Sequence, residues 1–153
     1  MNRDVREWIK KAEEDYLASA RLIRFKINPA YDAVCFHAQQ CAEKYLKGAL
    51  VSEGKLFPKI HDLRVLLDRL LTMHHEWNLL SPDADILTEY AVFFRYPGRW
   101  ADRKLARAAI DACDRIREAV RLSLGIQSKP ITRYRKNRKP QIRRRPRHRR
   151  TRK

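Results

Sequence analysis

His37, Gln40 and Lys44 follow one another at intervals of three and four residues, and Glu43 stands just before the lysine. Side chains at these intervals share one face of an α-helix, so a helix here would present an imidazole, an amide and an ammonium group together. Such a strip can line a cleft or a seam between subunits, where His37 could titrate near neutral pH. It can also be a hydrogen-bonded strip that fixes helix packing. We favour this structural interpretation, because buried polar groups need partners whatever their role.

Two further positions could take part in chemistry. His61 stands beside Asp62 and could form an acid/base pair with it, but Asp62 is more typical of a residue that caps the start of a helix, which we favour. Arg95 could clamp a phosphate with its planar guanidinium group, or it could donate to the last carbonyls of the preceding helix; both remain open. The histidines form no H-E-x-x-H motif and the three cysteines form no C-x-x-C pair. We therefore expect no metal site and no cofactor.

The elements that would position these residues are helices. Apolar residues recur at helical spacing in five segments: 4–26, 31–53, 62–71, 81–95 and 101–124. Asp62 is the expected N-cap of the third helix and Ser81 that of the fourth, while Gly54 and Gly125 are typical of helix C-termini. With only four glycines and no long alternation of apolar and polar residues, a sheet is disfavoured. We predict an all-α fold, a compact up-and-down bundle of four to five helices.

The charge of the chain is concentrated at its C-terminal end. Residues 127–153 hold 14 of the 35 Lys and Arg and none of the 18 Asp and Glu, so the first 126 residues carry 21 basic against 18 acidic side chains. We divide the chain into a helical bundle, 1–126, and a basic tail, 127–153, which has too few apolar residues to fold and is expected to be disordered.

Nucleic acid, RNA or DNA, is the first expected partner of the tail and an anionic membrane surface the second. The predicted nucleic-acid-binding residues are Arg143, Arg144, Arg145, Arg147, Arg149, Arg150, Arg152 and Lys153. The tail could also be an unusual gene end without a role.

Other features of the composition point to an ordinary cytoplasmic domain. No run approaches the roughly 18 apolar residues of a transmembrane helix, and the charged N-terminus shows no signal peptide. Cys41 and Cys113 fall in apolar patterns and are expected to be small core residues. The aromatic residues could stack on bases, but aromatics spaced along amphipathic helices usually make core or dimer contacts, which we expect here. This set is Trp77, Tyr90, Phe93 and Trp100.

Four sequence features occur together in a specific order. Residues 35–47 read Cys-Phe-His-Ala-Gln-Gln-Cys-Ala-Glu-Lys-Tyr-Leu-Lys, and the others are Trp8 with Ala12-Glu13-Glu14-Asp15, Lys59-Ile60-His61-Asp62-Leu63, and Phe94-Arg95-Tyr96-Pro97-Gly98. Over about residues 4–124 this combination resembles the prokaryotic HEPN domain family. The resemblance implies a helical bundle that commonly forms a homodimer and is often encoded beside a minimal nucleotidyltransferase. Many members act in toxin–antitoxin or defence systems, and the active branches are metal-independent ribonucleases.

The ribonuclease motif of that family is only partly present. It consists of an arginine, a polar residue, and a histidine four to six intervening positions after the arginine. Arg95 stands at the arginine position, but the three positions allowed for the histidine hold Trp100, Ala101 and Asp102. We therefore expect a non-catalytic or weakly active partner of a minimal nucleotidyltransferase. The alternatives are a ribonuclease toxin that uses Arg95 with His37 or His61, and a nucleic-acid-binding module that acts through the tail. The residues expected in a cleft or at the dimer seam are His37, Gln40, Glu43, Lys44, Arg95 and Tyr96.

Overall fold

The computed structural model describes residues 1–127, and within them every regular element is a helix. In chain order the elements are α1 (Arg3–Leu22), α2 (Tyr31–Ser52), α3 (Leu63–Asp68), the 3-10 helix η1 (His75–Leu80), α4 (Ser81–Phe93) and α5 (Arg103–Ser123). The predicted all-α bundle is confirmed. The disorder predicted for the basic tail concerns residues that, apart from Gln127, lie outside the described part of the chain.

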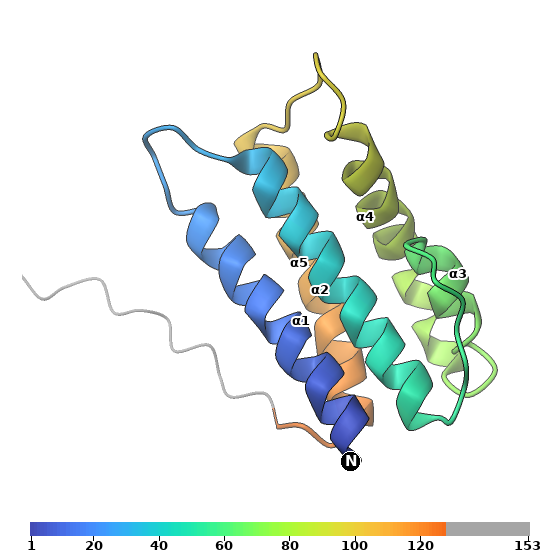
Figure 1. The fold of residues 1–153 in the computed structure, drawn as a ribbon. Helices are drawn as coiled ribbons and strands as arrows, with labels where there is room; N and C mark the ends of the chain where they lie inside the picture. Colours follow the sequence, from blue (N-terminus) through green and yellow to red (C-terminus); the bar gives the residue numbers. More distant parts are fainter. Residues whose placement is uncertain (128–153) are drawn as a thin grey trace, which may run out of the picture.

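Helix α2 is the central element of the bundle. Figure 1 shows it between α1 and α4, with α5 behind it and α3 beside its C-terminal half. The start of α1 and the end of α5 lie at one end of the bundle, and the connections 23–30 and 94–102 lie at the other. Within the described residues, no helix is both long enough and apolar enough to cross a membrane.

The core lies along the buried sides of α2. Tyr45, Leu46 and Leu50 have no exposed surface, and they belong to one core cluster with buried apolar side chains from the other helices. All three cysteines are buried and free, as the sequence predicts for Cys41 and Cys113. At Gly48 a Cβ atom would lie 3.3 Å from side-chain atoms of both Ile9 and Trp8, so the glycine allows α1 to approach α2 closely.

The helix ends agree with the sequence in some places and correct it in others. Asp62 is the N-cap of α3, as predicted, and its side chain accepts from the backbone N–H groups of Arg64 and Val65. Helix α3 ends at Asp68 rather than at residue 71, because a turn follows directly. The prediction that Ser81 is an N-cap is wrong. The 3-10 helix η1 runs straight into α4, so Leu80 holds the cap position and Ser81 is already helical.

Candidate functional site

The exposed side of α2 carries a row of polar side chains that bond to α1. Nδ1 of His37 lies 2.8 Å from one carboxylate oxygen of Asp15 on α1, and the ammonium group of Lys44 donates to the other oxygen. Lys44 also donates to the amide oxygen of Gln40 at 3.2 Å. The side chains of His37 and Lys44 are 31% and 21% exposed. The predicted row therefore exists as a half-buried network between two helices.

Glu43 is the centre of the second half of this row. Its carboxylate accepts from Lys47 Nζ at 2.7 Å and from Gln39 Nε2 at 2.9 Å, and Nδ1 of His61 lies 3.1 Å from both of its oxygens. Burial alone would raise the pKa of Glu43, but the hydrogen bonds from Lys47 and Gln39 hold it below its ordinary value. Because Glu43 and Lys47 are only 4% and 7% exposed, they form a buried ion pair.

The two halves of the row meet at Gln40. Its amide nitrogen donates to the side-chain oxygen of Gln39 at 2.8 Å, and Gln39 in turn donates to the backbone oxygen of His61 at 3.2 Å. His61 is thus held by Glu43 and Gln39, and its ring stays largely exposed. It does not pair with Asp62, whose carboxylate caps α3. The network fixes the start of α3 against α2, in line with the favoured structural interpretation.

Arg95 lies just beyond the C-terminal end of α4, at the far end of the same side of α2. Its guanidinium carbon lies 5.5 Å from the centre of the Phe36 ring, and the edge of that ring packs on His37 with the ring centres 5.4 Å apart. Arg95 and Phe36 line a depression of about 310 Å³ together with Asp32, Ala33, Tyr90, Ala91 and Phe94. Phe36 therefore connects His37 and Arg95, the two side chains that the sequence suggests for catalysis at this end of α2.

The positions after Arg95 have structural roles. Asp102 is the N-cap of α5 and accepts from the backbone N–H of Leu105 at 2.8 Å. The backbone N–H of Ala101 donates to Asp32 on α2 at 2.7 Å, which joins the connection to the bundle. Trp100 is 80% exposed. None of these three positions holds a histidine, and the carboxylate of Asp102 is engaged as the cap of α5.

Aromatic and apolar side chains are exposed around the end of α4. Trp77 is buried and Tyr90 is half-buried against the core, as expected. Phe93, Tyr96 and Trp100 are exposed. The guanidinium group of Arg99 lies 3.9 Å from the centre of the Phe93 ring. Arg99, Phe93 and Tyr96 line a second depression, of about 520 Å³, with Thr88, Glu89 and Val92.

A further charged cluster, which the sequence analysis missed, joins α1, α2 and α5. Glu13 on α1 accepts two hydrogen bonds from the guanidinium group of Arg117 on α5, at 2.6 and 2.8 Å, and one from the hydroxyl of Tyr45 on α2. Arg121 donates to the same hydroxyl at 3.2 Å. Burial would raise the pKa of Glu13, but these donors lower it below its ordinary value. The sequence feature that could have revealed this cluster is the pair Arg117 and Arg121, two arginines one turn apart beside the apolar stripe of α5.

The described residues contain no group of three or more His, Cys, Asp or Glu side chains that could hold a metal ion.

A family model described as "HEPN domain" matches residues 5–123. Two solved structures are similar. TT1696 from Thermus thermophilus is 28% identical, with a TM-score of 0.69 over 80% of this chain and 98% of that one. ST0689, described as an archaeal HEPN homologue, is 26% identical, with a TM-score of 0.63 over 81% and 99%. Comparison with curated protein sequences gives no significant match.

Proposed function

Because this chain belongs to the HEPN domain family, we propose that it is a non-catalytic member that acts by binding other proteins. The observation that carries this proposal is the connection after Arg95. Trp100, Ala101 and Asp102 occupy the positions where a catalytic histidine would stand, and Asp102 is engaged as a helix cap. Without a histidine there, and with the Asp102 carboxylate engaged as a cap, attack by a ribose 2′-hydroxyl on its neighbouring phosphate lacks the proton transfer it needs.

The proposed partners are a second copy of this chain and a minimal nucleotidyltransferase, within a toxin–antitoxin-like or defence system. Support for a second copy comes from exposed apolar side chains around the end of α4 and the start of α2, which water would otherwise cover: Phe36, Val92, Phe93 and Tyr96. Such a contact would also cover Arg95, which was expected at the dimer seam. The nucleotidyltransferase rests on the family alone.

A ribonuclease is the second candidate, and one observation favours it. The carboxylate of Asp15 lies 2.8 Å from Nδ1 of His37 and orients the ring. The Phe36 ring lies between this histidine and Arg95. In such a ribonuclease, His37 would be the general base and Arg95 would bind the phosphate.

The test is an RNA degradation assay with the full chain and with the variants Arg95→Ala and His37→Ala. Intact RNA with all three proteins is the result expected of a non-catalytic member. Cleavage by the wild type that both substitutions abolish would overturn the proposal and establish the ribonuclease.

The oligomeric state is tested separately by light scattering. Phe93→Glu places a charge among the exposed aromatic side chains and is expected to yield a monomer. Ile27→Glu is the control, because Ile27 is 84% exposed in the connection between α1 and α2. If the Phe93→Glu protein is as dimeric as the wild type, this surface is not part of the dimer seam.

A further inference from the structure

Charge is unevenly divided between the two sides of the bundle. The segment 53–93, which includes α3, η1 and α4, carries four basic and seven acidic side chains. The segments 1–30 and 101–126, which include α1 and α5, carry 13 basic and nine acidic side chains. The side formed by α1 and α5 is therefore the basic side of the folded domain.

On α1 the basic residues form a row. Arg3, Arg6, Lys10 and Arg21 are exposed, and their spacing places them along one side of the helix, with Arg24 just beyond its end. From Arg3 to Arg21 the helix rises by about 27 Å. Glu13 borders this row and is neutralised by Arg117, whereas Glu7 and Glu14 are exposed among the basic side chains.

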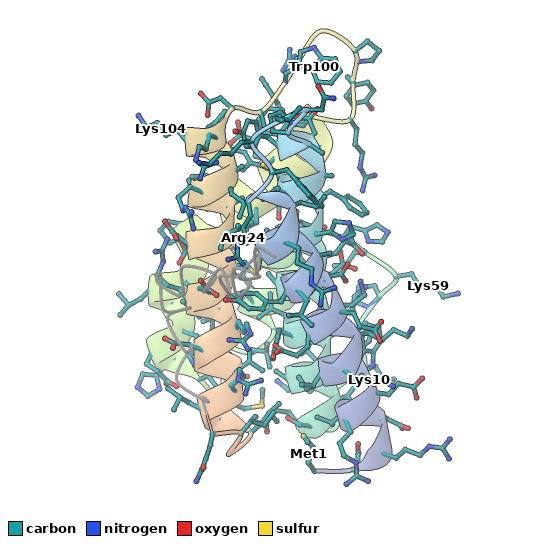
Figure 2. The ribbon with its side chains drawn as sticks, turned by 90° about the vertical axis from the view of Figure 1, so that its left-hand side faces the viewer. Met1, Lys10, Arg24, Lys59, Trp100 and Lys104 are labelled. Carbon is teal, nitrogen blue, oxygen red and sulfur yellow. The ribbon has the colours of Figure 1, made fainter. Side chains whose placement is uncertain are left out.

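Helix α5 extends the row at the end of α1. The guanidinium group of Arg103 donates to the backbone oxygen of Ile23 at 3.2 Å, which brings the start of α5 against the end of α1. Lys104 and Arg107 follow on the exposed surface of α5. Figure 2 shows α1 and α5 side by side, with Lys10 on α1, Arg24 after the end of α1, Lys104 on α5, and Trp100 beyond them at the end of the bundle. We call these eight residues the basic row: Arg3, Arg6, Lys10, Arg21, Arg24, Arg103, Lys104 and Arg107.

Two exposed aromatic side chains lie at the same end of the bundle. Phe25 follows Arg24 in the connection after α1 and is 57% exposed, and Trp100 precedes α5 and is 80% exposed. A flat ring beside a run of arginines can stack on an unpaired base while the guanidinium groups bind the phosphates on either side. Paired bases are already stacked and do not offer this contact.

We propose that the basic row binds single-stranded nucleic acid, with the phosphates along α1 and the start of α5 and with bases on Trp100 and Phe25. The charges extend along the length of α1, which fits a linear polyanion. The acidic side chains on the exposed surfaces of these two helices lie between or beside the basic ones: Asp4, Glu7, Glu14, Asp111 and Glu118. They limit affinity because they repel the phosphates.

The row also adjoins the point where the basic tail begins. Arg121 near the end of α5 donates to the backbone oxygen of Gln127 at 3.1 Å, at the end of the bundle where α1 starts. The sequence after this residue contributes 14 further Lys and Arg. The tail is left unchanged in the variants below, so a difference between them reports on the folded domain.

The test measures binding of a labelled oligouridylate to the full chain over a series of salt concentrations. The triple variant Lys10→Gln/Arg21→Gln/Arg107→Gln removes three charges of the row. The control Lys55→Gln/Lys59→Gln/Arg69→Gln removes three charges from the other side, so both proteins keep the same net charge and the same tail. We expect the row variant to lose about tenfold or more in affinity. Its slope of log K against log salt concentration should be less steep by about 2. The affinity and the salt slope of the control should change little.

Trp100→Ala separates stacking from charge. It is expected to weaken binding about tenfold while leaving the salt slope unchanged, because no phosphate contact is lost. Thermal unfolding of each variant shows that the fold is retained. Equal losses in the two triple variants, or tighter binding of a duplex than of the single strand, would overturn the proposal. So would binding to vesicles of anionic lipid that the row variant abolishes while RNA binding is unchanged.

Discussion

Substitution of Glu13 by Gln tests the idea that one charged cluster holds three helices together. The carboxylate of Glu13 is 31% exposed and receives hydrogen bonds from Arg117 and Tyr45, while the side chains of Arg117 and Arg121 are 13% and 11% exposed. Glutamine keeps the size of the side chain but removes its charge. Two nearly buried guanidinium groups then lose the carboxylate they share, and Nε of Arg121 already has no hydrogen-bond partner among the described residues.

The expected magnitude follows from the burial of the partners. Breaking a buried ion pair by removing one member costs about 3–5 kcal/mol. Because Glu13 itself is partly exposed and water can reach it, we expect the lower end, about 3 kcal/mol in the free energy of unfolding. For a domain of this size that corresponds to a melting temperature lower by about 10 °C. Urea denaturation monitored by circular dichroism measures the free energy directly.

The effect should also depend on pH in a defined direction. The hydrogen bonds lower the pKa of Glu13 in the folded chain, so its contribution to stability is present above its unfolded pKa, about 4.3, and is lost as the pH falls through the folded value. The difference between wild type and variant should therefore be constant near neutral pH and shrink in acid. Glu14→Gln, an exposed neighbour, is the control and should change stability by less than about 0.5 kcal/mol. If Glu13→Gln lowered the free energy of unfolding at neutral pH by no more than Glu14→Gln, the charged cluster would not be what holds the three helices together.

Three further predictions concern other parts of the bundle. Asp62→Ala removes the side-chain cap of α3 and should lower the free energy of unfolding by about 1 kcal/mol in urea denaturation. Leu46→Ala leaves a cavity at a fully buried position of α2 and should cost about 2–5 kcal/mol in the same assay; a smaller loss would show that the core collapses around it. Burial raises the pKa of Cys35 to about 12, and all three thiols are buried, so a thiol reagent should label the native chain slowly and label all three cysteines only after denaturant is added.

The sequence predicts the helices well because their signals are local. Apolar spacing and the Asp62 cap act within a few residues of the chain, and these predictions are confirmed apart from helix ends. Ser81 shows where local signals fail, since the 3-10 helix before it, stacked on the core through Trp77, decides where α4 starts. The partners of His37 and His61 could not be predicted, because Asp15 is 22 residues from His37 and Glu43 is 18 residues from His61. The Glu13–Arg117 contact spans 104 residues and depends on how α1 and α5 are placed around α2.

The six residues expected at a cleft or seam differ in their need for a partner molecule. Glu43 is buried in the single chain, and His37, Gln40 and Lys44 already have hydrogen-bond partners there. A second molecule that covered them would displace water from satisfied groups and gain little. Arg95 and Tyr96 instead lie among exposed aromatic rings, where each square ångström of apolar surface removed from water contributes about 25 cal/mol. A partner should therefore contact the end of α4 and the N-terminal turns of α2. That contact would cover Arg95 and Phe36 and leave the basic row on α1 and α5 open to a different ligand.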